Sequence, residues 1–344
     1  MSPTTTTILM SSLATGTIIT ASSFHWLMAW IGLEMNTLAI IPMVSKQHHP
    51  RATEAATKYF MTQAAASAMI LFASTMNAWQ TGTWDIINST NPTANTLLTT
   101  ALAMKLGLAP MHFWLPEVLQ GSNMKTAMII ATWQKLAPMA LIIQTYNNLS
   151  TPILLTMGML SSMTGGWAGL NQTQTRKIMA YSSIAHLGWM ATIITIMPNI
   201  MLLTLVLYLL MTTSMFYTLV LLNSKNIKDM ATSWTTSPMT ASMTMLILLS
   251  LGGLPPLTGF MPKWLILEEL TTQNLTTTAT IMAMSALLSL FFYLRLSYTS
   301  TITLSPNTTM TKHKWRFKQT TNTLLLTTTL PMSILMLPLT PMLL

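Results

Sequence analysis

Apolar stretches of helical length follow one another along almost the whole of this 344-residue chain. A helix needs about 20 mostly apolar residues to cross the hydrocarbon core of a bilayer. Only 7% of the residues are charged, whereas soluble domains carry about 25%. Because so few charges cannot coat a water-facing surface, the sequence predicts an all-α polytopic membrane protein.

Spans of this length fit into the chain about eleven times. The expected helices cover roughly residues 3–22, 24–44, 56–79, 96–117, 124–145, 150–170, 176–196, 199–222, 238–270, 275–297 and 322–343. Most lysine and arginine residues lie in loops after even-numbered spans, and none lies in a loop after an odd-numbered span. Basic loops remain on one side of a membrane, so this alternation supports the count and places the N-terminus on the basic side.

Glycine and proline interrupt the fourth and ninth expected spans. In both, Gly-Leu-x-Pro is followed by a second proline six residues later, so that Gly107 matches Gly253 and Pro110 matches Pro256. Proline removes a backbone donor and clashes with the preceding turn, which breaks or kinks a helix. The residues expected to interrupt helices are Gly107, Pro110, Pro138, Gly253, Pro255 and Pro256.

Interrupted helices at corresponding places in two halves are typical of transporters built from inverted repeats. The two broken spans are five apart in order, so they cross the membrane in opposite directions. We therefore predict a single membrane domain over residues 1–344. Within it, residues 1–145 and 150–297 form two inverted five-helix repeats, and residues 298–344 hold a basic loop and a terminal helix.

Four ionisable residues lie well inside the apolar spans: Glu34, Lys105, Lys135 and Lys263. A charge at the centre of a membrane helix costs roughly 2.5–3.5 kcal/mol on insertion scales, so we expect these side chains to relay protons. Glu34 is the expected partner of Lys105, because moving a carboxylate away from an ammonium favours release of the ammonium proton. The structural alternatives are a static ion pair for these two, packing for Lys135, and snorkelling of Lys263 to the membrane surface.

Other ionisable side chains give weaker signals. His112 and His186 titrate close to physiological pH and could pass a proton, although an interior histidine is more often only hydrogen-bonded. Glu54 is expected to pair with Lys58, four residues further along a helix. Arg295 lies near the basic-side end of its span and is expected to snorkel.

Several classes of site are excluded by what the sequence lacks. The absence of cysteine excludes disulfides, thiolate metal sites and cysteine-ligated iron–sulfur clusters. There is no glycine-rich nucleotide fingerprint, P-loop or metal-ligand cluster, so we expect no catalytic redox group, bound cofactor or metal on this chain. The net charge of +9 reflects basic loops on one side of a membrane rather than nucleic-acid binding.

Three segments carry a resemblance to a known family: Gly32-Leu-Glu34-Met-Asn36, the run from Lys105 to Glu117, and Leu251-Gly-Gly-Leu-Pro-Pro256 with Lys263. Over its whole length the chain resembles the subunit 2 family of mitochondrial NADH:ubiquinone oxidoreductase (complex I), one of the antiporter-like membrane subunits. Its 33 methionines also resemble the composition of proteins encoded in animal mitochondrial genomes.

The resemblance implies a core membrane-arm subunit of the respiratory chain, which translocates protons as NADH reduces ubiquinone and is an enzyme only as part of that complex. It implies that Glu34 and Lys105 form the coupling ion pair, Lys135 the central relay and Lys263 the relay toward the exit. NADH, FMN, iron–sulfur clusters and ubiquinone would be bound by other subunits. The implied partners are mitochondrially encoded and accessory membrane-arm subunits and lipids such as cardiolipin. The implied location is the mitochondrial inner membrane, with the N-terminus on the matrix side.

Two other functions remain open from the residues alone. A stand-alone cation/proton antiporter would share the broken helices, but a sodium carrier is expected to place more carboxylates in the membrane than Glu34 alone. A purely structural membrane subunit would have little reason to keep four charges inside its spans.

Overall fold

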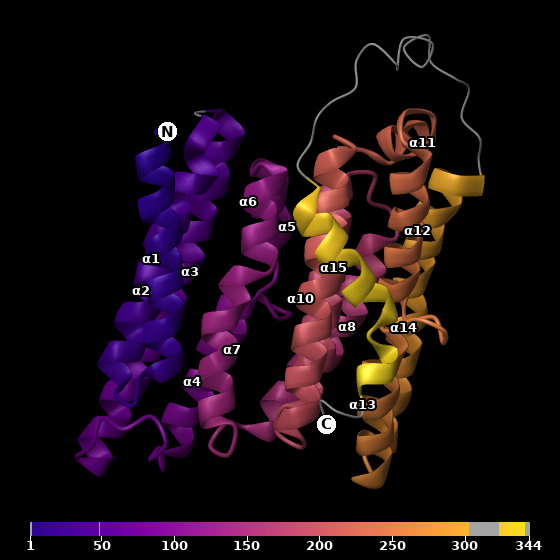
Figure 1. Cartoon of the computed structure of the whole chain (residues 1–344). Helices are drawn as coiled ribbons and strands as arrows, with labels where there is room; N and C mark the ends of the chain where they lie inside the picture. The colour runs from indigo at the N-terminus through magenta and orange to yellow at the C-terminus, as the bar shows by residue number, and fades with distance from the viewer. Residues whose placement is uncertain (1, 48, 303–322, 341–344) are drawn as a thin grey trace. The chain divides into compact units, whose positions relative to one another are not determined.

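The computed structural model describes residues 2–47, 49–302 and 323–340, and these ranges are built from helices (Figure 1). Extended pairing within them is limited to two isolated bridges, His25 with Asp85 and Gln174 with Asn226. The predicted all-helical fold is therefore confirmed. The basic-loop residues Lys312, Lys314, Arg316 and Lys318 and both ends of the expected terminal span lie outside the described residues.

The helices follow the apolar stretches of the sequence. The first are α1 (Pro3–Ser22), α2 (Trp26–Val44), α3 (Pro50–Thr81), α4 (Pro92–Leu106), α5 (Trp114–Gly121), α6 (Met124–Ala131), α7 (Leu136–Thr145) and α8 (Thr151–Gly169). They continue with α9 (Thr175–Ile193), α10 (Pro198–Leu221), α11 (Ile227–Thr236), α12 (Pro238–Gly252), α13 (Phe260–Thr272), α14 (Thr276–Ser297) and α15 (Leu324–Leu335). Short 3-10 turns are η1 (Ser45–Gln47), η2 (Trp133–Lys135) and η5 (Leu337–Leu339), and a π-helical turn, η3 (Tyr298–Ile302), follows α14.

Local sequence sets where several of these helices begin. The Ser2 hydroxyl accepts a hydrogen bond from the backbone amide of Thr5, and the Asn91 side chain accepts one from Thr93. Such side chains satisfy amides that the first helical turn leaves without a partner. Proline opens α1, α3, α4 and α12, where its fixed φ angle suits a helix and its missing N–H is not needed.

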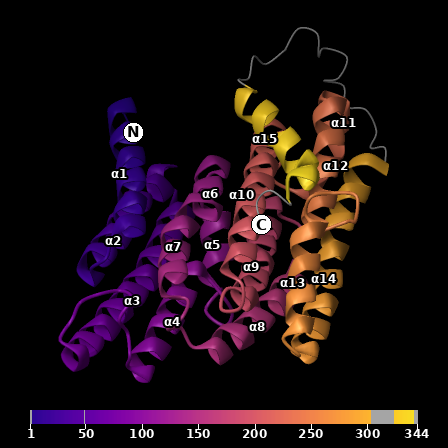
Figure 2. The ribbon, with the colours of Figure 1, turned by 60° about the horizontal axis from the view of Figure 1, so that its bottom comes forward.

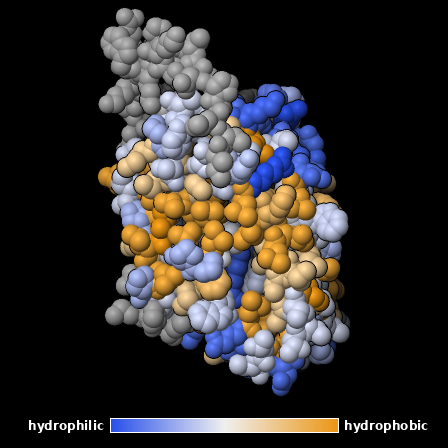
Figure 3. Space-filling model, turned by 90° about the vertical axis from the view of Figure 1, so that its right-hand side faces the viewer, coloured by the Kyte–Doolittle hydropathy of each residue, from blue (hydrophilic) through white to orange (hydrophobic). Residues whose placement is uncertain are grey.

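Four stretches of described helix are long and apolar enough to cross a membrane: Trp26–Val44, Met124–Thr145, Pro198–Leu221 and Thr276–Thr301. Large apolar side chains lie exposed on the surface, among them Trp79 at 91% and Phe24 at 81% of full exposure. On the face that Figure 3 shows, hydrophobic side chains gather across the middle and more hydrophilic ones lie toward both ends. Exposed apolar surface of this kind is stable against lipid rather than water.

Helix α11 occupies a stretch in which the sequence pattern indicated only a basic loop. It begins with a capping box, in which Asn226 and Asp229 each satisfy a backbone amide at the start of the helix. Met230 on this helix is fully buried, whereas Lys228, two residues earlier and on the opposite face, is exposed. The helix is therefore amphipathic. Its 10 residues are too few and too polar to be recognised in the sequence as a membrane span.

The chain divides into two compact units. The first holds residues 1–161 and 194–198, and the second holds residues 162–193 and 199–344, so the boundary falls inside α8. In the first unit α2 packs on α1 and α3, α3 also packs on α4 and α5, and α7 packs on α1, α2 and α4 (Figures 1 and 2). In the second unit α12 packs on α11, α14 and α15, and α13 packs on α9 and α14.

Candidate functional site

The first broken helix ends at a glycine. Helix α4 stops at Leu106, and Gly107 follows in the left-handed conformation with φ 81° and ψ 39°. Its amide donates to the carbonyl of Met104, and the amide of Leu108 donates to the carbonyl of Ala103, which is the Schellman arrangement that closes helices. Pro110 lies four residues beyond Leu106 in the irregular connection to α5. Glycine thus ends the helix, and the proline stands where the chain has already turned.

The second broken helix ends in the same way. Helix α12 stops at Gly252, and Gly253 follows with φ 80° and ψ 45°. The amides of Gly253 and Leu254 both donate to the carbonyl of Leu249. Pro255 and Pro256 lie in the connection to α13. Both breaks therefore place the C-terminal end of a half-helix at the point where the backbone turns, and a cation is stabilised there by the helix dipole.

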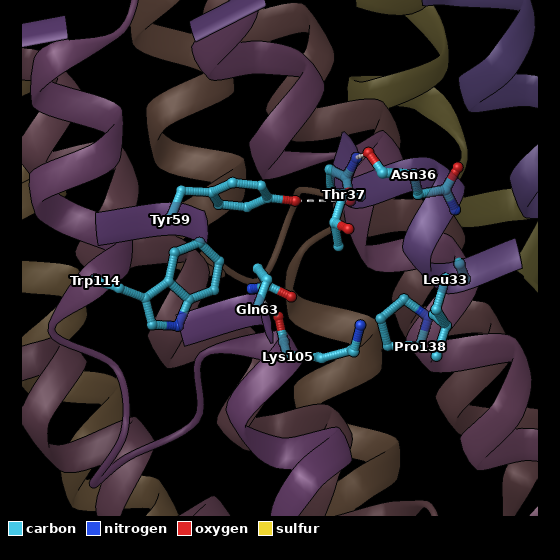
Figure 4. Close-up of a pocket in the computed structure, with 10 residues that line it drawn as sticks. Leu33, Asn36, Thr37, Tyr59, Gln63, Lys105, Trp114 and Pro138 are labelled. Atoms are coloured by element: carbon cyan, nitrogen blue, oxygen red, sulfur yellow. Dashed lines mark hydrogen bonds between the residues drawn. The ribbon is translucent and has the colours of Figure 1, made fainter. Parts of the chain in front are cut away.

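Lys105 lies in the last turn of α4, directly before the first break. Its side chain is only 5% exposed, and its Nζ has no hydrogen-bond partner in the described structure. Figure 4 shows the ammonium pointing into a small cavity beside Pro138. An unpaired ammonium buried in this way is unusual, because burial without a partner carries a large desolvation cost.

The cavity next to Lys105 draws its walls from several helices of the first unit. Its volume is about 10 Å³, which is close to the smallest space that holds one water molecule. The lining residues are Leu33, Asn36 and Thr37 of α2, Tyr59 and Gln63 of α3, Lys105, Trp114, Gln134, Ala137 and Pro138. Six of these ten residues have polar side chains: Asn36, Thr37, Tyr59, Gln63, Lys105 and Gln134.

Glu34 lies on α2, between cavity-lining residues Leu33 and Asn36. Its carboxylate is near enough to interact electrostatically with Lys105 and with Tyr59. The two charged groups do not form a direct ion pair in the described structure, because the Oε2 atom of Glu34 and the Nζ atom of Lys105 are both buried without a hydrogen-bond partner. The carboxylate and the ammonium are therefore close enough to interact but are not hydrogen-bonded to each other.

Lys135 lies at a third interruption, between α6 and α7. It is the last residue of the 3-10 turn η2 and is 5% exposed. Pro138, three residues later, has no N–H to donate to the carbonyl of Gln134, which disfavours a regular helix through this point. The interruption therefore begins before the proline, at Thr132 (φ −115°, ψ −71°), and it places Lys135 inside the first unit.

Three residues that line the cavity were not identified as site residues from the sequence: Tyr59, Gln63 and Gln134. The Tyr59 hydroxyl donates to Oε1 of Gln134 at 3.3 Å, and Nε2 of Gln134 donates to the backbone carbonyl of Asn36 at 3.2 Å. The Gln63 amide donates to the backbone carbonyl of Lys105 at 3.4 Å. Polar residues inside apolar spans were the available signal, but nothing local indicated which distant groups they bind.

In the second unit Lys263 binds the end of the second half-helix. Its Nζ donates to the carbonyl of Gly252 at 2.9 Å, at the C-terminal end of α12. A cation there is stabilised by the helix dipole and satisfies a carbonyl that has no helical partner. Lys263 is thus part-buried and hydrogen-bonded, in contrast to Lys105.

The two histidines occupy different surroundings. The Nε2 atom of His186 lies 3.5 Å from the Tyr293 hydroxyl, and its ring centroid lies 5.6 Å from that of Tyr208. His112 lies in the connection between α4 and α5, where it is 7% exposed and its ring packs on Phe113. His186 therefore has a hydroxyl partner within the second unit, and His112 lies beside the first break.

Charged residues at the start of α3 form a separate exposed cluster. Lys58 pairs with Glu54 at 2.6 Å, as predicted, and with Glu117 of α5 at 2.6 Å. The Lys58 ammonium lowers the pKa of the Glu54 carboxyl. Among the described residues, no group of three or more histidine, aspartate or glutamate side chains is arranged to hold a metal ion.

The sequence profile of the NADH:quinone oxidoreductase/Mrp antiporter transmembrane family matches residues 23–289, and that of the NADH dehydrogenase subunit 2 C-terminus matches residues 290–344. The NADH-ubiquinone oxidoreductase chain 2 proteins of Oncorhynchus mykiss and Salmo salar are each 59% identical to this chain over 341 residues. Each alignment covers 99% of this chain and 98% of the relative.

A solved structure supports the same grouping. In respiratory complex I from Thermus thermophilus with bound Aureothin, one chain superposes with a TM-score of 0.82 at 26% identity. The superposition covers 96% of this chain and 78% of that chain. The chain described here therefore belongs to the NADH:quinone oxidoreductase/Mrp antiporter family of transmembrane proteins, within its NADH-ubiquinone oxidoreductase chain 2 branch.

Proposed function

We propose that this chain is a core membrane-arm subunit of respiratory complex I, and that it translocates protons coupled to electron transfer from NADH to ubiquinone. The observation that carries the proposal is Lys105: its buried ammonium lies at the end of a broken helix, has no hydrogen-bond partner in the described structure and interacts electrostatically with Glu34. Membership of the chain 2 branch supports the coupling to NADH oxidation. The redox cofactors lie in other subunits of the complex.

The proton step at this site is an exchange between two charge arrangements. When the Glu34 carboxylate approaches, the ammonium form of Lys105 is stabilised and the side chain takes up a proton. When the carboxylate withdraws, the buried ammonium loses its stabilising charge and releases the proton. Lys135 receives it as the central relay, Lys263 passes it toward the exit, and His112 and His186 serve as further relay groups.

The membrane topology belongs to the same proposal. About eleven spans form two inverted five-helix repeats and a terminal helix, with the N-terminus on the matrix side of the mitochondrial inner membrane. The matching left-handed conformations of Gly107 and Gly253 support a repeat relationship between the two breaks. The partners are other membrane-arm subunits, mitochondrially encoded and accessory, together with inner-membrane lipids such as cardiolipin.

Replacing Lys105 tests the proposed function directly. Lys105→Ala in the assembled complex should lower proton pumping by about a hundredfold or more, because a positioned acid or base contributes at least that much. The matched control is Lys125→Ala, which removes an exposed lysine and should leave pumping unchanged. Both variants are compared in sealed membrane vesicles supplied with NADH and a quinone.

Each outcome of this comparison discriminates between functions. Normal pumping in Lys105→Ala would overturn the relay, and failure of that variant alone to assemble would support a structural subunit. Proton movement driven by a sodium or potassium gradient in the absence of NADH would support a stand-alone antiporter instead.

A further inference from the structure

We propose that Gln134 is a positioning residue that couples the turn carrying Lys135 to the helix carrying Glu34. This inference rests on the proposed function and adds to it a group whose hydrogen bonds go to the Tyr59 hydroxyl and the Asn36 backbone. Gln134 precedes Lys135 in the 3-10 turn η2, so the two residues share one backbone segment. A displacement of this turn therefore moves both side chains together.

The Gln134 amide uses both of its ends to hold neighbouring helices. Its Nε2 donates to the Asn36 carbonyl of α2, two residues after Glu34, and its Oε1 accepts from the Tyr59 hydroxyl of α3. An amide whose donor and acceptor are both engaged fixes its orientation, because rotating it would leave partly buried polar groups unpaired. Gln134 is thus the point at which α2, α3 and the third break meet.

Helix α3 extends this connection to the first break. Tyr59 and Gln63 are four residues apart and lie on one face of the helix. Tyr59 binds Gln134, whereas Gln63 binds the Lys105 carbonyl. The Trp114 ring packs edge-on against Tyr59 with centroids 5.8 Å apart. One turn of α3 therefore joins the segment bearing Lys105 to the segment bearing Lys135.

The surrounding packing leaves little room for these parts to move separately. The cavity they enclose is about 10 Å³, space for roughly one water molecule. Close-packed interiors transmit displacements instead of absorbing them, and a 3-10 turn within a helix often marks a hinge. A shift of η2 as Lys135 gains or loses a proton is therefore passed through Gln134 to α2, where it changes the separation between Glu34 and Lys105.

The experiment compares Gln134→Leu with Gln144→Leu in the assembled complex in membrane vesicles. Gln144 is the matched control, because it lies on α7 and its amide donates to the Ala21 carbonyl of α1 at 2.8 Å. Gln134→Leu should lower the pumping rate about tenfold, since it removes two hydrogen bonds of the connection. Gln144→Leu removes an interhelical bond of the same kind and should leave the rate near that of the unaltered protein.

A second background separates coupling from loss of structure. In Glu34→Asp the shorter carboxylate already alters the separation from Lys105, so Gln134→Leu should then lower the rate by only about twofold. A tenfold loss in both backgrounds would overturn the inference. Free-energy effects of independent sites add, so an independent Gln134→Leu would lower the rate by the same factor in each background. If Gln134→Leu does not assemble, Tyr59→Phe removes a single hydroxyl of the same connection and is judged by the same comparison.

The result for Lys105→Ala distinguishes failure of this inference from failure of the proposed function. Normal pumping without Lys105 would overturn the function itself. Loss of pumping in Lys105→Ala together with an unchanged rate in Gln134→Leu would overturn only the role of Gln134.

Discussion

The ammonium of Lys263 donates a 2.9 Å hydrogen bond to the carbonyl oxygen of Gly252, the last residue of α12. The lysine reaches back from α13 across the break to bind the half-helix that precedes it. Lys105 stands at the corresponding end of α4 but belongs to the half-helix itself, and its ammonium has no hydrogen-bond partner in the described structure. The two breaks thus share a backbone conformation and differ in how their lysines are held.

Lys263→Met should weaken the end of α12. The variant removes a hydrogen bond from a charged group to Gly252, which typically contributes about 1.5–3 kcal/mol, and a cation at a helix C-terminus. We expect faster hydrogen exchange of the Gly253 and Leu254 amides and reduced proton pumping, measured on the same preparation. Lys263→Arg keeps the charge and should exchange more slowly than Lys263→Met. Equal exchange in the unaltered protein and in Lys263→Met would contradict the role of this bond.

Gly253→Ala should impair pumping more than Gly82→Ala. Both glycines have positive φ, 80° and 72°, where an L-residue costs about 1–2 kcal/mol. A Cβ on Gly253 would lie 3.0 Å from Nζ of Lys263, whereas one on Gly82 would meet nothing within 4 Å. Only Gly253→Ala therefore displaces the lysine. The prediction is tested by measuring the pumping rates and the thermal stability of the two variants. Equal pumping rates would contradict it.

The Glu54–Lys58 pair should make a pH-dependent contribution to stability. Lys58 lowers the pKa of Glu54, so the pair stabilises the fold above the ordinary carboxyl pKa, about 4.3. This contribution is lost as the pH falls through the lowered pKa of the folded state. The melting temperature of Lys58→Met should therefore lie below that of the unaltered protein at neutral pH and converge with it in acid. A difference in melting temperature that grows on acidification would contradict the predicted direction of the pH dependence.

Tyr293→Phe should slow pumping if His186 relays protons. The change removes only the hydroxyl that lies 3.5 Å from Nε2 of His186 and keeps the aromatic ring of the side chain. We expect a loss smaller than that of His186→Ala, which removes the titrating group itself. Tyr298→Phe is the control, because Tyr298 is 53% exposed. Identical rates in Tyr293→Phe and the control would exclude the hydroxyl from the path.

The ends of many helices could be predicted because they depend on local chemistry. The expected span 3–22 corresponds to α1 (Pro3–Ser22), and the expected span 275–297 corresponds to α14 (Thr276–Ser297). The length of an apolar run and the capping or proline residue beside it determine such ends. The amphipathic helix α11 was missed, because a short segment with charges in its first turn lacks the apolar length of a span.

The sequence by itself determined that the chain is a helical membrane protein, where its helices break, and which few charges remain inside the apolar spans. Each of these depends on residues close together in the chain. Tertiary structure alone decided what the buried groups bind. The hydroxyl of Tyr59 reaches Gln134, 75 positions away, and the amide of Gln134 reaches Asn36, 98 positions away. Such partners are chosen by the packing of whole helices, which no short stretch of sequence encodes.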